Sequence, residues 1–180
     1  MAATPPPPAL RPDARFVFAH PAHTVALAAG AGLSPWAAGT VGTLWAWLVF
    51  VVLQPWMNDG RWALLLAAAL PLGWWACSVT ARALQRQDPG CIVWDEVLGF
   101  WLVLWLLMPA HWGEQLAAFA LFRYFDAAKP GPVGWADRLY ADVDAQQQPR
   151  GWWRIGWGIL LDDLVAAGCT LLLLAVWRAL

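Results

Sequence analysis

The stretch "IGWGILLDDLVAAGCTLLLLAVW" (residues 155–177) is long and apolar enough to cross a lipid bilayer as a helix, yet it contains two adjacent carboxylates. A helix needs roughly 20 residues to cross the hydrocarbon core. Asp162 and Asp163 lie about two turns inside this stretch. An ionised carboxylate in or near the bilayer core is costly and is usually functional. The pair therefore indicates a membrane helix that carries part of a site.

A second adjacent pair, Asp95 and Glu96, interrupts the apolar stretch "IVWDEVLGFWLVLWLLMPA" (residues 92–110). Acids in a first helical turn can simply respond to the helix dipole, which is the structural alternative for this pair. Two such pairs in separate apolar stretches need a common explanation. We expect them to meet if their helices bring them to the same depth.

The composition is that of a membrane protein. Of the 180 residues, 61% are hydrophobic and only 13% are charged, about half the charged share of roughly 25% in soluble domains. The 16 Trp residues are expected mainly as anchors at the membrane–water interface. A net charge of −1 gives no electrostatic case for binding nucleic acid. The three Cys residues are too scattered to support a zinc site or a disulfide framework.

Other apolar stretches cover residues 40–57, 62–81 and 115–126, the last of which is short enough that its crossing stays open. Residues 24–39 are broken by Gly and Pro, which favours a re-entrant or interfacial segment. The predicted fold is an all-α polytopic membrane protein with about four to five apolar helices. Residues 1–23, with four consecutive prolines, predict a disordered or extended tail. Residues 24–180 then form a single helical domain, in which residues 127–154 are a polar cytoplasmic loop.

The basic residues predict the orientation. With a cytoplasmic N-terminus and a crossing at each apolar stretch, Arg61 and Arg178 lie on the outer side. The other nine basic residues lie on the cytoplasmic side, as the positive-inside rule requires: Arg11, Arg15, Arg82, Arg86, Arg123, Lys129, Arg138, Arg150 and Arg154. This topology also brings six acidic residues to similar depth on the cytoplasmic side: Asp95, Glu96, Asp126, Asp137, Asp162 and Asp163.

Converging carboxylates repel one another unless a cation lies between them. Mg²⁺ is the natural choice, because it takes oxygen ligands and commonly keeps waters and a substrate phosphate. Arg123 and Lys129 flank Asp126 at helical spacing, and such a mixture of charges suits a phosphorylated ligand. An Arg123–Asp126 ion pair without further consequence is the structural alternative. Pro130 disfavours helix at Lys129, so we expect Lys129 to project from a helix end.

The segment "GAGLSPWAAGTVGTL" (residues 30–44) is rich in Gly, Ser and Thr. Its backbone N–H groups could cradle an anion at the entrance to the helix expected over residues 40–57. Ser34 and Thr40 are therefore candidate phosphate-binding residues. Membrane helices also use Gly and Ser for ordinary packing, which is the alternative here.

Four motifs in this order resemble the phosphatidylglycerophosphatase A family of bacterial inner-membrane lipid phosphatases. They are "GLSPWAAGTVGTL" (32–44), "IVWDEVLG" (92–99), "FRYFDAAKPGP" (122–132) followed by "WADR" (135–138), and "GILLDDLVAAG" (158–168). The resemblance implies hydrolysis of the phosphate monoester of phosphatidylglycerol phosphate, a membrane lipid, to phosphatidylglycerol and inorganic phosphate. It also implies Mg²⁺ dependence, an all-helical fold and an active site that faces the cytoplasm.

The resemblance also implies roles for individual residues. The expected Mg²⁺ ligands are Asp95, Glu96, Asp162 and Asp163. Catalytic roles are expected for Asp95, Asp126, Lys129 and Asp163. Phosphate binding is expected from Arg123, Lys129, Arg138, Ser34 and Thr40, and Asp137 is a further site candidate. The family usually has Pro-Gly-Thr where this chain has Ala38-Gly39-Thr40.

A membrane transporter or ion pathway is the alternative function, because intramembrane Asp and Glu pairs also mark those proteins. That alternative predicts paired half-sequences, and the sequence contains no such internal repeat. Within the phosphatase hypothesis, direct attack by water and a covalent aspartyl-phosphate route both stay open. The sequence leaves the acyl-chain preference, the number of metal ions and the oligomeric state undetermined.

Overall fold

A computed structural model of the chain describes residues 12–143, 148 and 150–180. These residues form helices joined by short connections and contain no β-strand, so the predicted all-helical fold is confirmed. In chain order the helices are α1 (Ala14–Ala19), α2 (Pro21–Ala26), the 3₁₀ helix η1 (Ala28–Leu33), α3 (Ala38–Leu53), the 3₁₀ helix η2 (Gln54–Trp56), α4 (Asp59–Leu84), α5 (Trp94–Leu107), α6 (Trp112–Ala128), α7 (Pro132–Arg138) and α8 (Gly151–Ala179).

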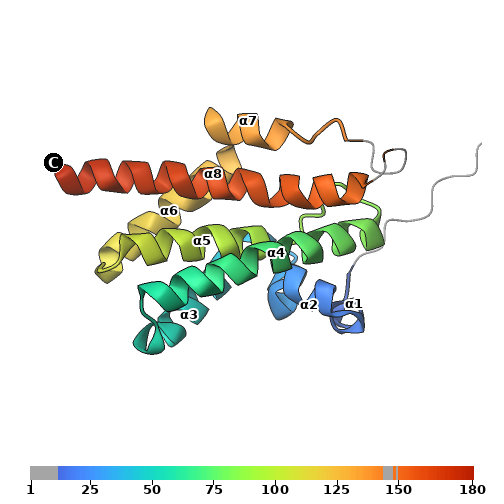
Figure 1. Cartoon of the computed structure of the whole chain (residues 1–180), viewed down its shortest axis with the longest axis horizontal. Helices are drawn as coiled ribbons and strands as arrows, with labels where there is room; N and C mark the ends of the chain where they lie inside the picture. Colours follow the sequence, from blue (N-terminus) through green and yellow to red (C-terminus); the bar gives the residue numbers. More distant parts are fainter. Residues whose placement is uncertain (1–11, 144–147, 149) are drawn as a thin grey trace, which may run out of the picture.

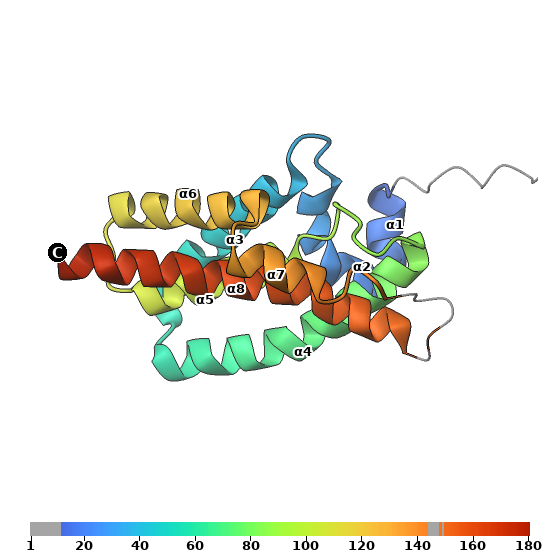
Figure 2. The same cartoon turned by 90° about the horizontal axis from the view of Figure 1, so that it is seen from above.

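Helices α5 and α8 lie side by side and form the centre of the bundle (Figure 1). Helix α4 packs on one flank of α8 and α6 on the other, as the view from above shows (Figure 2). Helix α3 packs against α5, and the short α7 lies on the outer side of α8. Helices α1 and α2 gather at the end of the bundle where α8 begins.

Within the described part of the chain, three helical segments are long and apolar enough to cross a membrane: Ala38–Trp56, Asp59–Leu84 and Gly151–Ala179. Two of the five expected apolar helices are shorter. Helix α5 has 14 residues, and α6 has 17. At 1.5 Å per residue α5 reaches about 21 Å, less than the hydrocarbon thickness of about 30 Å. Because α5 is largely buried among its neighbours, its apolar surface is explained by packing inside the protein.

Several tryptophans donate hydrogen bonds between helices inside the bundle. The indole N–H of Trp94 donates to the Ala69 carbonyl of α4 over 3.2 Å, and that of Trp101 donates to the Ala46 carbonyl of α3 over 2.9 Å. Both side chains are buried. The expectation that Trp residues serve mainly as interfacial anchors therefore does not extend to Trp94 and Trp101, and it stays a prediction for the exposed Trp36, Trp56 and Trp112.

Two predicted boundaries were wrong. The tail expected over residues 1–23 is too long, because Asp13 caps α1 by accepting a hydrogen bond from the Phe16 N–H over 2.8 Å; residues 1–11 lie outside the described part. The polar loop expected over residues 127–154 contains α7, and α8 already begins at Gly151. Helix α1 is stabilised by the Asp13 cap, whereas α7 has no side-chain cap and packs against α8.

The segment expected to be re-entrant or interfacial, residues 24–39, folds as α2, η1 and an irregular connection. It packs against the residues that precede α5. The Val93 N–H donates to the Ala26 carbonyl over 2.9 Å, and a Cβ on Gly32 would lie 1.9 Å from the Cys91 carbonyl oxygen. These contacts fix the start of α5, where Asp95 and Glu96 lie.

Helix α8 approaches α4 closely at Gly156, where a Cβ would lie 2.0 Å from Ser78 Oγ and 2.8 Å from Ser78 N. We expect Gly156→Ala to force the two helices apart and to destabilise the protein by about 1–3 kcal/mol. Gly168→Ala on the same helix is the matched control, because nothing lies within 4 Å of its Cβ position. Thermal unfolding in detergent, followed by circular dichroism, measures both. Equal melting temperatures for the two variants would contradict the close contact.

Candidate active site

The first turn of α5 and the middle of α8 bring three carboxylates together. Asp95, Glu96 and Asp163 each offer one oxygen, and these oxygens all lie within 4.8 Å of one another. Glu96 and Asp163 are buried, and Asp95 is half-buried. Asp95 Oδ1, Glu96 Oε2 and Asp163 Oδ2 have no hydrogen-bond partner among the described residues. Buried oxygens without a donor are costly, so this arrangement fits a divalent cation that takes oxygen ligands.

A glycine permits this approach of the two helices. Gly99 lies one turn after Asp95 on α5, and a Cβ there would lie 3.0 Å from the Asp163 carbonyl oxygen and 3.0 Å from the ring of Phe122. The backbone of α8 therefore packs almost directly on α5 at the level of the carboxylates. A second glycine, Gly39 at the start of α3, lies against Glu96, because its Cβ would be 2.1 Å from Glu96 Oε1.

Two cationic side chains complete the cluster. Arg123 of α6 forms an ion pair with Asp126 and lies 3.6 Å from Glu96. Lys129 ends α6 in a left-handed backbone conformation, with φ of 46°. Its ammonium donates to Asp137 of α7 and, over 2.7 Å, to Asp162 of α8. The expected helix end at Lys129 is confirmed, and its side chain joins α7 and α8 rather than Asp126.

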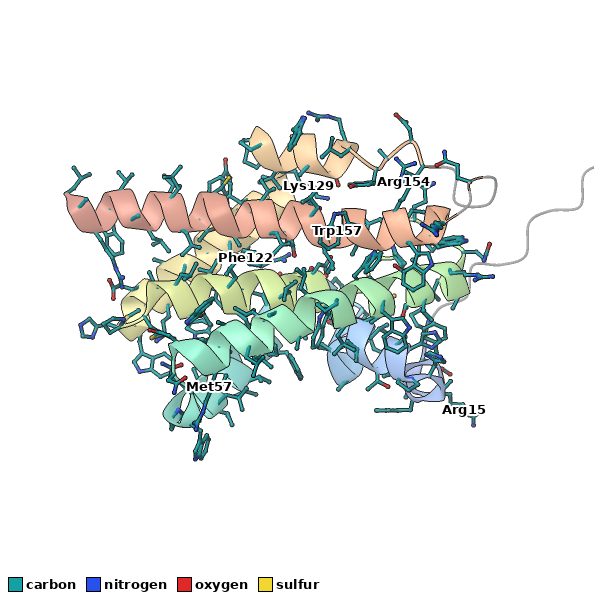
Figure 3. All side chains as sticks on the ribbon, viewed as in Figure 1. Arg15, Met57, Phe122, Lys129, Arg154 and Trp157 are labelled. Atoms are coloured by element: carbon teal, nitrogen blue, oxygen red, sulfur yellow. The ribbon has the colours of Figure 1, made fainter. Side chains whose placement is uncertain are left out.

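The partners of Lys129 stabilise its charged form. Burial disfavours the ammonium form, but the hydrogen bonds to Asp137 and Asp162 outweigh burial and hold the pKa of Lys129 above its ordinary value. Lys129 is therefore a fixed positive charge at neutral pH. Figure 3 shows this side chain between the ribbons of α7 and α8.

The cluster has an excess of negative charge. Its six carboxylates are Asp95, Glu96, Asp126, Asp137, Asp162 and Asp163, and its two cationic groups are Arg123 and Lys129. If all are ionised, six negative and two positive charges leave a net charge of −4. Like charges at these separations repel strongly in a poorly hydrated site. Bound cations or retained protons must offset part of this charge.

A cavity of about 410 Å³ opens onto the cluster. Asp95, Glu96, Asp126, Lys129, Asp137 and Asp162 line it, together with apolar side chains such as Ile155 and Ile159. Such a volume and such mixed walls suit a small charged group attached to an apolar body.

The structure places the remaining predicted site residues outside the group of three carboxylates. Asp162, the fourth expected metal ligand, lies outside the group of three and pairs with Lys129. Arg138 is exposed on α7. Ser34 Oγ donates to the Trp36 carbonyl over 2.7 Å, within its own turn. Neither these two residues nor Thr40 is among the side chains that line the cavity, although Thr40 directly follows Gly39.

Sequence reasoning missed Gln87, Asp88 and Tyr140, which also line the cavity. The amide of Gln87 donates to the Val143 carbonyl over 2.8 Å and so joins the α4–α5 connection to the segment after α7. One signal was available for Asp88, since it lies in a short polar break on the same predicted side as the other acids. Tyr140 carried no such signal, because its position depends on how α7 packs on α8.

The three converging oxygens predict divalent-cation binding that depends on Asp163. Titration of the purified protein with Mn²⁺, followed by electron paramagnetic resonance, should show binding that Asp163→Asn weakens about tenfold or more. Asp59→Asn is the matched control at the opposite end of the bundle, where Asp59 accepts a hydrogen bond from Trp105 that an amide can also accept. Unchanged Mn²⁺ affinity in Asp163→Asn would remove this residue from the ligand set.

Comparisons with a family model and with individual relatives agree on one family. The model of the family "Phosphatidylglycerophosphatase A" matches residues 24–178. Phosphatidylglycerophosphatase A of Escherichia coli (strain K12) is 35% identical over 155 residues, covering 84% of this chain and 80% of the relative. Phosphatidylglycerophosphatase A of Haemophilus influenzae is 33% identical over 156 residues, covering 87% of this chain and 88% of the relative.

A third relative carries a different name. A candidate phosphatidylinositol-3-phosphatase of Bacteroides thetaiotaomicron is 32% identical over 155 residues, covering 83% of this chain and 88% of the relative. No solved structure matches the chain. The family match spans both acidic pairs, α6, α7 and the apolar helices around them. On this match, the chain belongs to the phosphatidylglycerophosphatase A family.

Proposed function

We propose that this protein hydrolyses the terminal phosphate monoester of phosphatidylglycerol phosphate, releasing phosphatidylglycerol and inorganic phosphate, with Mg²⁺ as its cofactor. The observation that supports this best is the set of three converging carboxylates beside the cationic Arg123 and Lys129, each carboxylate having one buried oxygen without a hydrogen-bond partner among the described residues. The named relatives support the substrate class, since all three are named as phosphatases of phospholipids.

Asp95, Glu96 and Asp163 would hold Mg²⁺, and Asp162 lies beside them on α8. When bound, Mg²⁺ supplies a positive charge for the phosphate oxygens and a Lewis acid for the phosphorus–oxygen bond. The carboxylates keep their positions because α5 and α8 pack through Gly99. This rigidity lowers the reorganisation needed as charge develops on the phosphate.

Lys129 binds the non-bridging phosphate oxygens in this proposal. It lines the cavity, and Asp137 and Asp162 orient its ammonium from two helices. Arg123 acts on the other side, where it holds Glu96 and Asp126 in place. An attacking water loses a proton and the leaving glycerol oxygen gains one. Asp126 and Asp162, which line the cavity, are placed to accept and deliver these protons.

The basic residues favour a cytoplasmic location for the site in the bacterial inner membrane. Arg154 lies toward the start of α8, Lys129 lies nearer the middle of the bundle, and Met57 lies toward the other end (Figure 3). An excess of Lys and Arg marks the cytoplasmic side of membrane proteins. At that level the lipid tails stay in the bilayer while the headgroup phosphate reaches the carboxylates.

Phosphate release from phosphatidylglycerol phosphate in detergent micelles tests this proposal. We expect release that needs Mg²⁺ and stops with chelator, and we expect Asp163→Asn to lower kcat/KM about 100-fold or more, because a ligand charge is lost where the transition state needs it. Asp59→Asn should retain wild-type kinetics. Folding of each variant is checked by thermal unfolding.

Three results would contradict different parts of the proposal. Release that persists with chelator would remove the metal but keep the substrate. Full activity of a folded Asp163→Asn variant would move the chemistry away from this cluster. Absence of release by the folded wild-type protein would exclude this substrate and favour the transport alternative.

A further inference from the structure

A second hollow lies next to the proposed active site, between α4 and α8, and has a volume of about 770 Å³. We call it the α4–α8 groove. Its walls are mostly apolar and come from Leu70, Pro71, Trp74, Trp153, Arg154 and Trp157. Both helices are candidate membrane spans. An apolar groove on such helices is accessible to lipid from the side.

The groove has a cationic rim. Arg150 and Arg154 line it at the start of α8, and no acidic side chain among the described residues forms an ion pair with either of them. Arg154 donates to the side chain of Gln148 over 3.0 Å, which leaves further guanidinium donors available. Guanidinium groups that have no acidic partner among the described residues and lie beside an apolar wall match the phosphodiester and acyl chain of a phospholipid.

Tyr140 joins the groove to the catalytic cavity, because its side chain lines both hollows. It packs directly on α8 at Gly158, where a Cβ would lie 2.9 Å from Tyr140 Cβ. Along α8, Arg154 precedes Asp162 by eight residues, which is about 12 Å at the helical rise. One extended lipid headgroup can therefore contact both places.

The wall of the groove is held in place by tryptophans. The Trp74 indole N–H donates to the Trp153 carbonyl over 2.7 Å, from α4 to α8. The ring of Trp74 lies 5.2 Å from that of Trp153 and 6.2 Å from that of Trp157. A preformed wall costs little ordering when a chain binds.

We propose that the α4–α8 groove is the lipid-anchoring subsite of the enzyme. This inference rests on the proposed function. The groove receives an acyl chain of the same phospholipid whose terminal phosphate monoester enters the catalytic cavity. Arg154, with Arg150, binds the internal phosphodiester of that lipid. Figure 3 shows Arg154 and Trp157 on the first turns of α8, with Lys129 nearby between α7 and α8.

Photolabelling tests the occupant without relying on turnover. The wild-type protein in micelles is irradiated with phosphatidylglycerol phosphate that carries a diazirine in one acyl chain, and the labelled peptides are identified by mass spectrometry. We expect labels at residues 70–74 and 153–157 to exceed those at residues 48–52 of α3, where Leu48 and Val52 are exposed. Phosphatidylcholine with the same diazirine should not show this preference.

Two labelling results would overturn the proposal. Equal labelling of the groove and of α3 would mean that only bulk lipid touches these helices. Equal preference for phosphatidylcholine would mean that the groove takes lipids without regard to the headgroup. Because labelling does not require hydrolysis, it decides the role of the groove even if the lipid is not turned over.

Steady-state kinetics test whether Arg154 binds the phosphodiester. Arg154→Gln should raise KM for phosphatidylglycerol phosphate about tenfold relative to KM for glycerol phosphate, which has no phosphodiester and no acyl chain, because one charge-assisted contact is lost. Arg154→Lys should restore part of the affinity. Arg15→Gln, at an exposed position of α1 (Figure 3), is the matched control. An equal change in KM for both substrates would contradict binding of the phosphodiester by Arg154.

Discussion

The close approach of α5 to α8 brings Asp95 and Glu96 against Asp163 in a part of the protein that is largely closed to water. Desolvated like charges cost free energy unless cations or protons offset them. The surrounding structure supplies two of those cations, Arg123 from α6 and Lys129 from the end of α6. In the proposed function, the remaining excess of negative charge attracts a divalent ion, and that ion in turn attracts the phosphate.

Two glycines set both the helix packing and the positions of the carboxylates. Gly99 places the backbone of α8 on α5, and Gly39 places the start of α3 against Glu96. A larger residue at Gly39 would displace the Glu96 carboxylate, and one at Gly99 would press on the Asp163 backbone carbonyl and the Phe122 ring. The same residues that allow small helix–helix distances in membranes therefore set the spacing of the charges. Lys129 adds a third connection, because it joins α7 to α8 through two carboxylates.

The two hollows divide the recognition of a lipid between different physical interactions. The cavity at the cluster offers fixed charges of both signs, and the α4–α8 groove offers aromatic and aliphatic walls with an arginine rim. Tyr140 lies at their junction. A phosphatase of a membrane lipid has this double requirement, because its substrate has a charged headgroup and apolar chains that remain in the bilayer.

The sequence by itself determined the fold class, the apolar helices and the acids that carry the proposed chemistry. These follow from local properties: hydropathy over about 20 residues, and carboxylates where a bilayer makes them costly. The helix end at Lys129 was predictable from Pro130 for the same local reason. The helical character of residues 14–19 and 132–138 was not predicted, because such short helices depend on their neighbours and, for residues 14–19, on the Asp13 cap.

Only the tertiary structure decided which acids meet. Asp162 and Asp163 are adjacent in sequence, yet successive helical residues point about 100° apart, so Asp163 joins Asp95 and Glu96 while Asp162 faces Lys129. The approach of Arg123 to Glu96, the burial of Trp94 and Trp101, and the place of Tyr140 depend in the same way on helix packing. Those contacts join residues far apart in the chain, and no pattern within a single segment specifies them.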